Sequence, residues 1–374
     1  MVAGEPASEG VPTIYTVATR AGVSIATVSR VLNGHSQIRP ETERRVLEAV
    51  RELGFVPNAA AQGLSKGLKR ILGLVFANPW WQDDEVSVED THLLFADTVI
   101  RGAQWRADQQ GYSLLLLSAG NSGPRSSSFG DFIGKVDGLI LLDRVVDNER
   151  VGTITDRVPV VLLAGSGRAR NAVTVRVDNE RGVRAVVEHL VALHGLTRLA
   201  FVSGLPDSPD NDARQSAFEA AARELGASFE PVGSLGADWT SSGAVEAMTR
   251  RLDEKERPLP EALVCANDQM AVGAMHALVN AGIAIPDEVA VVGFDDIPVA
   301  RYLSPPLTTV RQPMKDLGAA AVDALVDQLQ RRRIAARDIV LPTELVVRGS
   351  CGCQPDSRSM VTELEQVTLE TAGA

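Results

Sequence analysis

Few residues of this 374-residue sequence have the types and spacing that metal binding requires. Its three cysteines, Cys265, Cys351 and Cys353, are too few for a disulfide-stapled domain, and its five histidines form no HxH or HExxH motif. No further ligand lies near Cys351 and Cys353 in the sequence, so we expect a solvated tail there, with metal binding or a redox pair as the alternative. The sequence therefore predicts no metal site.

Motifs for catalysis are missing as well. The sequence contains no GxSxG and no GxxxxGK[ST], and Gly165-Ser166-Gly167 lacks the third glycine of a dinucleotide-binding loop. Acidic residues beside a cleft could still act as the acid and base of a glycosidase, so a sugar-processing enzyme is the rival class. We expect no catalytic residue and no cofactor.

Chemistry suited to DNA is found near the N-terminus. Helical patterns at Ile14–Arg20 and Ile25–Leu32 flank the turn Ala21-Gly22-Val23, and Ser24 can cap the second helix. A helix, a short turn with glycine and a second helix are typical of the helix-turn-helix, whose second helix enters the major groove. Arg30 on the exposed face has a planar donor fork that matches O6 and N7 of guanine.

Charge and a third helix support this interpretation. Residues 11–70 carry nine Lys/Arg and four Glu, a net +5, whereas the whole chain carries −11. A basic module on an acidic body keeps phosphate attraction local to one end of the chain. A third helical pattern begins near Pro40 and ends at Gly54, with Val46, Val50 and Leu53 at helical spacing.

Repeated units of a strand followed by a helix begin at Ile71. Apolar strands are expected at Ile71–Phe76, Ser113–Leu117, Gly138–Leu142, Val158–Leu163, Leu199–Ser203, Ala262–Cys265 and Val289–Phe294. Helices are expected at Phe95–Gln110, Asn179–Leu193, Asp212–Leu225, Ser242–Glu256 and Asp268–Ala281. This alternation predicts parallel sheets covered by helices, and roughly 280 residues suit two such lobes.

The stretch TIYTVATRAGVSIATVSRVLNG (Thr13–Gly34) closely resembles the headpiece of the lactose/galactose repressor (LacI/GalR) family of transcription factors. PNAAAQGLSKG (Pro57–Gly67) is similar to the hinge helix of that family. The resemblance covers roughly residues 13–350. It implies an all-α helix-turn-helix headpiece plus an α/β body of two lobes with parallel sheets, like a periplasmic binding protein. The expected boundaries are a disordered leader at 1–10, the headpiece at 11–57, the hinge helix and linker at 58–70, the effector-binding and dimerisation body at 71–350 and a tail at 351–374.

The resemblance implies a set of DNA contacts. They comprise base contacts by Arg30, Ile25 and Ala26, phosphate contacts by the hydroxyls of Tyr15, Ser24, Thr27 and Ser29, further contacts by Asn33 and Asn58, and a minor-groove wedge by Leu64. Two positions depart from the family pattern. Thr16 stands where the family usually has a carboxylate, so we expect the capping box with Thr13 to be lost, at about 0.5–1 kcal/mol. Gln62 stands where an arginine is common, which weakens one phosphate contact.

The resemblance also implies an effector site beyond the carboxyl ends of the strands. Its residues are Arg214, Trp239, Asn267 and Asp295, with Asp143 from the first lobe. An arginine fork, an amide, a carboxylate and an aromatic face together suit a polyol. Alternatives remain: Trp239 could be a core aromatic, Asp295 and Asp296 could cap a following helix or turn, and Asn267 or, as we prefer, Asp268 could cap a helix. The inserted segment with Trp80 and Trp81 could cover the ligand or lie on the surface.

The function implied is a sequence-specific DNA-binding regulator, a repressor of carbohydrate-utilisation genes that binds a palindromic operator as a homodimer. Its small effector is expected to be a sugar, with a purine or other metabolite acting as corepressor as the alternative. A transport-type binding protein is disfavoured because the N-terminus lacks a signal peptide, and no apolar run approaches the ~18 residues of a membrane helix. We therefore expect a cytoplasmic, nucleoid-associated protein.

Overall fold

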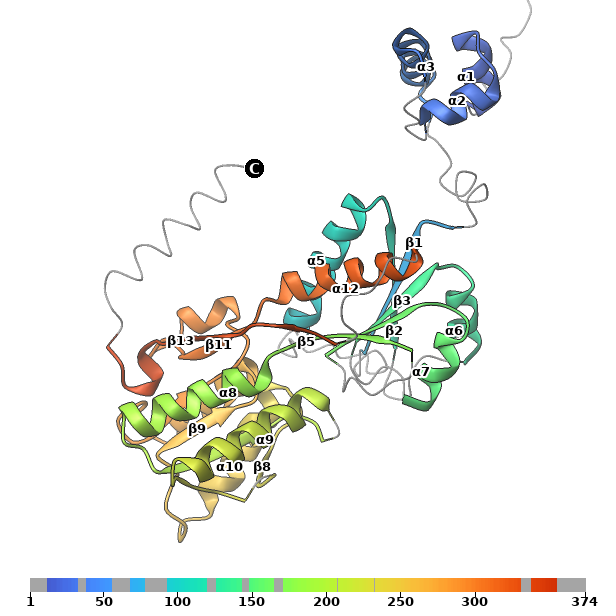
Figure 1. The fold of residues 1–374 in the computed structure, drawn as a ribbon. Helices are drawn as coiled ribbons and strands as arrows, with labels where there is room; N and C mark the ends of the chain where they lie inside the picture. The colour runs from blue at the N-terminus through green and yellow to red at the C-terminus, as the bar shows by residue number, and fades with distance from the viewer. Residues whose placement is uncertain are drawn as a thin grey trace, which may run out of the picture. The chain divides into compact units, whose positions relative to one another are not determined.

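The computed structural model describes residues 12–32, 38–55, 68–77, 93–119, 126–142, 148–164, 171–206, 208–231, 233–330 and 338–354. The chain forms two compact units, residues 1–70 and 71–374, and each is described by itself (Figure 1).

In the described part of the N-terminal unit there are three helices, α1 (Ile14–Ala21), α2 (Ile25–Leu32) and α3 (Pro40–Leu53). They enclose a small core of Val17, Ala18, Ala21, Val28, Val31, Val46 and Ala49. Both helix ends predicted from glycine are present, since Gly22 and Gly54 adopt left-handed dihedrals with φ of 62° and 61°. The expected order of three helices is confirmed, and so is the start of the third helix at Pro40.

The expectation about the start of α1 is wrong. The Thr13 hydroxyl accepts a hydrogen bond from the Thr16 backbone N–H at 3.3 Å, and the Thr16 hydroxyl accepts one from the Thr13 backbone N–H at 2.9 Å. A complete capping box is therefore present without a carboxylate. The expectation was wrong because the Thr16 hydroxyl oxygen accepts the hydrogen bond from the Thr13 backbone N–H as a carboxylate would.

The first lobe of the second unit is built on a six-stranded parallel sheet in the order β12-β5-β4-β3-β1-β2. The strands are β1 (Ile71–Ala77), β2 (Ser113–Ala119), β3 (Gly138–Leu142), β4 (Val160–Leu163), β5 (Val173–Val177) and β12 (Asp338–Leu341). Four helices cover this sheet: α5 (Leu93–Gln109), α6 (Ser126–Ile133), α7 (Asn148–Thr155) and α12 (Met314–Leu329).

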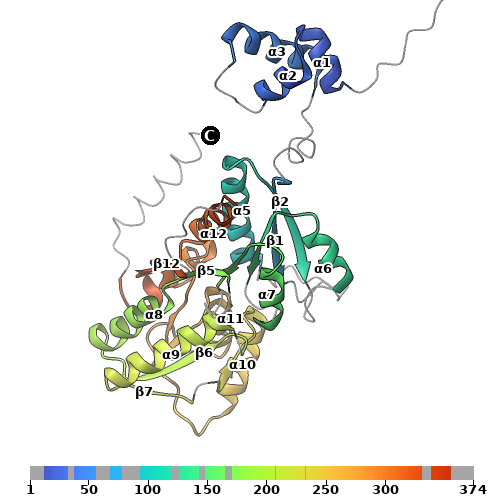
Figure 2. The same ribbon diagram turned by 45° about the vertical axis from the view of Figure 1, so that its right-hand side comes forward.

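Successive side chains of β3 serve opposite faces of this sheet. Ile140 belongs to the core beneath α5 and α12, whereas Leu139 and Leu141 pack with Phe132 of α6 and Val151 of α7. Both faces are thus buried under helices, as a parallel sheet requires, and Figures 1 and 2 show α5 and α12 side by side. Because both faces are buried, the inner strands β3 and β4 appear in the sequence as continuous apolar runs.

The second lobe contains a smaller parallel sheet in the order β10-β9-β6-β7, with β8 also paired to β6. Its strands are β6 (Arg198–Ser203), β7 (Ser228–Phe229), β8 (Leu235–Gly236), β9 (Ala262–Cys265) and β10 (Ala290–Val292). Its helices are α8 (Asn179–Glu188), a π-helical turn η1 (His189–Leu193), α9 (Pro209–Glu224), α10 (Ser241–Asp253), α11 (Asp268–Asn280) and a 3-10 turn η2 (Pro298–Arg301).

Three stretches of chain link the two lobes. The first runs from β5 into α8, the second from β11 (Thr309–Arg311) into α12, and the third from β12 into β13 (Glu344–Val346). Strands β11 and β13 pair antiparallel beside the second lobe, and a 3-10 turn, η3 (Gly349–Cys351), follows β13. Any change in the angle between the lobes must therefore be accommodated by bending of these three stretches.

All seven predicted strands and all five predicted helices of the body are present, with ends that differ by a few residues. The sequence analysis missed β5, β7, β8, β11, β12 and β13, and helices α6, α7 and α12. The expected hinge helix, Asn58–Leu64, lies outside the described residues. Among the helices that the structure describes, none is long and apolar enough to cross a membrane.

Candidate DNA-binding face and effector site

Helix α2 has one buried face and one open face. Val28 and Val31 are buried in the headpiece core, whereas Ser24, Ile25, Ala26 and Arg30 are exposed. Thr27 and Ser29 lie half-buried at the border between the two faces, and Tyr15 on α1 is 66% exposed. Since the predicted base-reading residues share the open face, α2 can present them together to a major groove.

Hydrogen bonds hold the start of α2 in place. The Ser24 hydroxyl accepts from the Thr27 backbone N–H at 3.1 Å, so the predicted cap is confirmed. Arg45 of α3 donates to the carbonyls of Ala21 and Gly22, the latter at 3.2 Å, and thereby ties the turn to the third helix. The predicted contacts Asn33, Asn58 and Leu64, together with Gln62, lie outside the described residues.

In the body, Arg214 is the buried centre of the candidate effector site. It lies on α9, and its side chain is only 4% exposed. Its Nε donates to Asn179 Oδ1 at 2.8 Å and its Nη1 donates to the Ala266 carbonyl at 2.6 Å. Its guanidinium carbon lies 3.7 Å from the centre of the Phe294 ring. The fork is therefore held in one orientation, which pre-organises its remaining donors for a ligand.

One further side chain, Asp210, completes the support of Arg214. Asp210 Oδ2 lies 3.8 Å from Arg214 Nη2, and Asp210 Oδ1 accepts from Asn179 Nδ2 at 2.7 Å. Sequence reasoning missed Asn179 and Asp210. Their positions could have indicated both residues, because each lies at the start of a helix that follows a strand. Asn179 is the first residue of α8, and Asp210 lies in the first turn of α9.

Trp239 and Asn267 approach each other at the same edge of the second sheet. Asn267 Nδ2 donates to the Trp239 carbonyl at 3.1 Å, and Arg214 lies 5.7 Å from the Trp239 ring centre. The ring packs on the backbone of Gly204 at the end of β6, where a Cβ would stand 2.4 Å from Trp239 Cε2. Trp239 is only half-buried, which leaves part of the ring available for stacking.

Asn267 is also the N-cap of α11. Its Oδ1 accepts from the Met270 backbone N–H at 2.8 Å, so the preference for Asp268 as the cap is wrong. Asp268 is fully buried, and its carboxylate accepts from the Ile297 backbone N–H at 2.9 Å and from the Thr309 hydroxyl. The extended backbone of Asn267 suits a cap, whereas Asp268 is already the first helical residue.

Asp295 has the backbone geometry of a constrained site residue. Its φ of 132° is rare for a residue with a side chain, and its carboxylate accepts from Gln312 Nε2. Burial raises the pKa of Asp295 to about 8, although the positive charge of Arg214 opposes the shift. Burial likewise raises the pKa of Asp268 to about 7, against the hydrogen bond from Thr309. Two buried carboxyls that resist ionisation therefore lie near each other, with the charge of Arg214 acting on Asp295 and that of Arg348 on Asp268.

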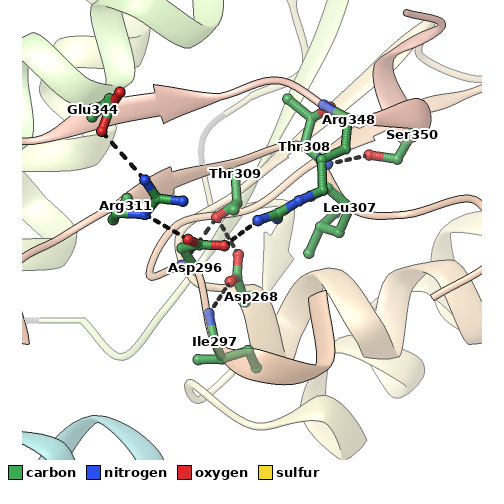
Figure 3. Close-up of polar contacts among 10 residues, drawn as sticks. All are labelled: Asp268, Asp296, Ile297, Leu307, Thr308, Thr309, Arg311, Glu344, Arg348 and Ser350. Carbon is green, nitrogen blue, oxygen red and sulfur yellow. Dashed lines mark hydrogen bonds and ion pairs between the residues drawn. The ribbon is translucent and has the colours of Figure 1, made fainter. Parts of the chain in front are cut away.

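Asp296 binds two arginines, Arg311 and Arg348, as Figure 3 shows, and the N-cap of the η2 turn that follows is Ile297. Asp296 Oδ1 accepts from Arg348 Nη2 at 2.6 Å and its Oδ2 from Arg311 Nε at 2.7 Å, and Arg311 also lies 3.4 Å from Glu344. Burial opposes ionisation of this carboxyl, but Arg348 and Arg311 hold the pKa of Asp296 below its ordinary value. The residue next to Asp295 is thus paired with β11 and with the chain just after β13.

The structure therefore brings together Arg214, Trp239, Asn267 and Asp295. Their role as effector ligands stays a prediction. Asp143, Trp80 and Trp81 lie outside the described residues, so the contribution of the first lobe is not placed. Phe294 and Gln312 were missed in sequence; only their positions, directly before Asp295 and just after β11, could have indicated them.

Each of the two units matches a known protein family. Residues 13–58 match the family described as bacterial regulatory proteins, lacI family, and residues 187–351 match the periplasmic binding protein-like domain. Catabolite control protein A of Priestia megaterium is 31% identical over 342 residues, which cover 90% of this chain and 98% of that protein.

Two solved structures are similar over nearly the whole chain. The lac repressor dimer bound to operator and an anti-inducer has a TM-score of 0.76 at 28% identity, covering 91% of this chain and 99% of that chain. The complex of the transcriptional regulator CelR with cellobiose has a TM-score of 0.65 at 30% identity, with the same coverage of both chains.

A helix-turn-helix headpiece joined to a two-lobed α/β body defines a class of DNA-binding transcriptional regulators, not enzymes. Within that class, the chain belongs to the lacI family of bacterial regulatory proteins. The resemblance inferred from Thr13–Gly34 and the expected fold class are confirmed.

Proposed function

We propose that the protein is a homodimeric repressor whose affinity for a palindromic operator is controlled by a sugar or sugar derivative. The observation that carries the effector assignment is the buried Arg214 fork, held by Asn179 and Ala266 beside Asp295. The site of action is DNA, which places the regulator in the cytoplasm with the nucleoid.

The DNA-binding part of the proposal rests on the open face of α2. Arg30 reads guanine through O6 and N7, while Ile25 and Ala26 offer apolar contact to a thymine methyl group. Ser24, Thr27, Ser29 and Tyr15 contact phosphates and set the register. The predicted residues Asn33, Asn58 and Leu64 extend these contacts toward the centre of the operator.

Dimerisation follows from the size of the headpiece and from the surface of the first lobe. One short recognition helix contacts too few base pairs for high specificity, whereas two copies related by a two-fold axis match a palindrome. Trp105 on α5 and Leu116 on the edge strand β2 are 59% and 45% exposed, so this side of the first lobe has apolar surface for a partner copy. The similar lac repressor structure is a dimer on operator DNA.

The effector chemistry is that of a polyol between the lobes. Two of the five N–H groups of Arg214 donate to protein acceptors in the described residues, so others can reach ligand oxygens. The second oxygen of Asp295 can accept from a hydroxyl, and the half-buried Trp239 ring can stack on sugar C–H groups. Asp143, Trp80 or Trp81 would close the site from the first lobe.

Coupling requires that the ligand prefer one arrangement of the lobes. Asp295 precedes Asp296, which is paired with Arg311 at the start of the second linking stretch and with Arg348 just after β13. A ligand that positions Asp295 therefore acts one residue from a carboxylate that is bonded to the second linking stretch. The hinge helix around Leu64 would then be ordered only in the arrangement that the ligand disfavours.

A purine corepressor is the second candidate, because the Trp239 ring could stack on a base. Phe294 is not available for this purpose, since the Arg214 guanidinium already covers its face at 3.7 Å. Among the described residues, one half-buried aromatic, Trp239, lies beside an arginine, a carboxylate and an amide, and these polar groups suit the hydroxyls of a sugar better than a planar base.

The test is a ligand screen on the full-length protein with monosaccharides, disaccharides, purine bases and nucleosides. Calorimetry follows each ligand that raises the melting temperature. We expect a sugar to bind the wild-type protein but not Asp295→Asn. The control Arg223→Met, which alters an exposed arginine on the helix that carries Arg214, should still bind it. Tight binding of hypoxanthine or guanine without any sugar response would overturn the sugar assignment.

A further inference from the structure

Four metal-ligating side chains that are far apart in the sequence meet at one end of the second lobe. Cys351 Sγ lies 3.3 Å from His189 Nε2, and Cys353 Sγ lies 3.3 Å from His194 Nε2 and 3.6 Å from His189 Nε2. The two imidazole Nε2 atoms are 3.2 Å apart. The cluster shares no residue with the α2 face or with the effector site.

We propose that His189, His194, Cys351 and Cys353 form a tetrahedral binding site for one zinc ion. With Zn–N bonds of about 2.05 Å and Zn–S bonds of about 2.3 Å, a regular tetrahedron has N–N edges of about 3.3 Å and N–S edges of about 3.6 Å. The four separations above, 3.2 to 3.6 Å, match these edges. All four ligand atoms lie within 4.8 Å of one another, so the longest edge needs to shorten by only about 1 Å.

Local backbone structure explains why the two histidines converge. Residues five apart on an α-helix point roughly 140° away from each other around the axis. The chain instead forms a π-helical turn at His189–Leu193, in which i→i+5 hydrogen bonds place residues five apart nearly above one another. His194, directly after this turn, therefore lies on the same side as His189, and the rings meet edge to face at 4.8 Å.

The cysteines are placed by a turn that requires glycine. Gly352 has φ of 99°, a conformation that side chains disfavour, and it directs Cys351 and Cys353 to the same histidine pair. Cys351 is 2% exposed, so the expectation of a solvated tail at this residue is wrong. The body continues through η3, because Ser350 is also buried and donates to the Val291 carbonyl of β10.

A supporting hydrogen bond favours the thiolate that a metal needs. The Thr308 hydroxyl donates to Cys351 Sγ at 3.1 Å, and the same oxygen accepts from the Arg348 backbone N–H at 2.8 Å. Such contacts orient a ligand and stabilise its negative charge. Two thiolates and two imidazoles in tetrahedral array select zinc over magnesium and calcium, which prefer oxygen ligands.

The ion would fasten the C-terminal end of the body to the end of α8. Cys351 follows Arg348 by three residues, and Arg348 binds Asp296 beside the effector site. In the described residues, the hydrogen bonds of Cys351 and Cys353 with His189 and His194 join this end of the body to the π-helical turn. A bound zinc ion would replace them with metal bonds and would stabilise the second lobe and the chain that follows β13.

The test is metal analysis of the full-length protein purified under reducing conditions and loaded with one equivalent of zinc. We expect about one zinc per chain after gel filtration in the wild type and in the controls Cys265→Ala and His276→Gln, whose residues lie outside the cluster. Cys353→Ser and His194→Gln alter the partly exposed ligands, so these chains should fold, and we expect at least tenfold weaker zinc binding. Cobalt(II) should produce the visible absorption of a tetrahedral thiolate site in the wild type and not in Cys353→Ser.

A second measurement separates a structural metal from adventitious binding. A zinc chelator should lower the melting temperature of the wild-type protein to that of Cys353→Ser and should leave Cys353→Ser unchanged. Zinc content below 0.2 per chain, equal zinc affinity in Cys353→Ser, or a Cys351–Cys353 disulfide found by thiol counting in the reduced preparation would overturn the proposal. Each of these outcomes is independent of whether the effector is a sugar.

Discussion

Replacement of Arg348 by methionine tests the polar network that joins the effector site to the linking stretches. Arg348 is 8% exposed, donates to Asp296 at 2.6 Å and donates to the Leu307 carbonyl at 2.8 Å. Methionine keeps most of the side-chain volume but leaves a buried carboxylate with one cation fewer. Breaking a buried pair in this way costs about 3–5 kcal/mol, and Arg311, which still binds Asp296, favours the lower end. We expect the melting temperature of the body to fall by roughly 5–10 °C.

The assay is thermal unfolding of the full-length protein, with Arg176→Met as the matched control. Arg176 pairs with Asp338 at 2.7 Å, but both side chains are more than a third exposed, so its loss should cost less than about 1 kcal/mol. The double variant Arg348→Met/Asp296→Asn removes the unpaired charge and should recover a large part of the loss.

The pH dependence of this loss has a definite sign. The pKa of Asp296 is lower in the folded protein than in the unfolded chain, so its ionisation stabilises the fold above pH ~4 and the benefit disappears as the pH falls. The deficit of Arg348→Met should therefore be largest at neutral pH and shrink as the pH falls below ~4. A deficit below about 1 kcal/mol, or a double variant that is less stable than Arg348→Met, would refute the proposed role of the pair.

Three further predictions concern DNA, ligand and assembly. Arg30→Ala should weaken operator binding by about 1–3 kcal/mol and relax the sequence preference at one base per half-site. The control Arg44→Ala, on α3, should not change base preference. Equal losses of affinity on all sequences in a binding selection would make Arg30 a phosphate contact. Effector affinity should rise with pH up to about 8, because the raised pKa of Asp295 keeps part of the population protonated and only the carboxylate accepts freely. Calorimetry of the wild-type protein at several pH values measures this rise, and an affinity that does not change with pH would exclude ionisation of Asp295 as its source. Sedimentation should show a dimer at micromolar concentration, and a stable monomer that operator DNA does not shift would contradict the two-fold arrangement.

The sequence was sufficient to predict the headpiece because its signals are local. Ser24 caps α2, Gly22 and Gly54 end helices, and the core side chains recur at helical spacing, all within about 40 residues. The error at Thr16 arose because a hydroxyl replaces the usual carboxylate as acceptor. Strands of the body were predicted where the sequence is a continuous apolar run. Strand β5 was missed because Thr174 and Arg176 interrupt its run, and short strands such as β11 and β13 have too few residues to show a pattern.

The sites depend on contacts that no local pattern contains. Asn179 meets Arg214 across 35 residues, and Cys351 meets His189 across 162 residues. A search for ligands near Cys351 in the sequence could not find His189, because the fold and the π-helical turn bring them together. Family resemblance identified Arg214 and Asp295, but the residues that hold them in place required the structure.

The most direct test of the central claim is a titration of labelled operator with the full-length protein, with and without the sugar found in the ligand screen. The operator is first obtained by selection from random DNA, which should enrich a two-fold symmetric site with a guanine in each half-site. We expect the sugar to change operator affinity by about 5- to 150-fold in the wild type and to leave Asp295→Asn unaffected while that variant still binds operator. No preference for a symmetric site over random DNA, or a bound sugar that leaves operator affinity unchanged, would contradict the account.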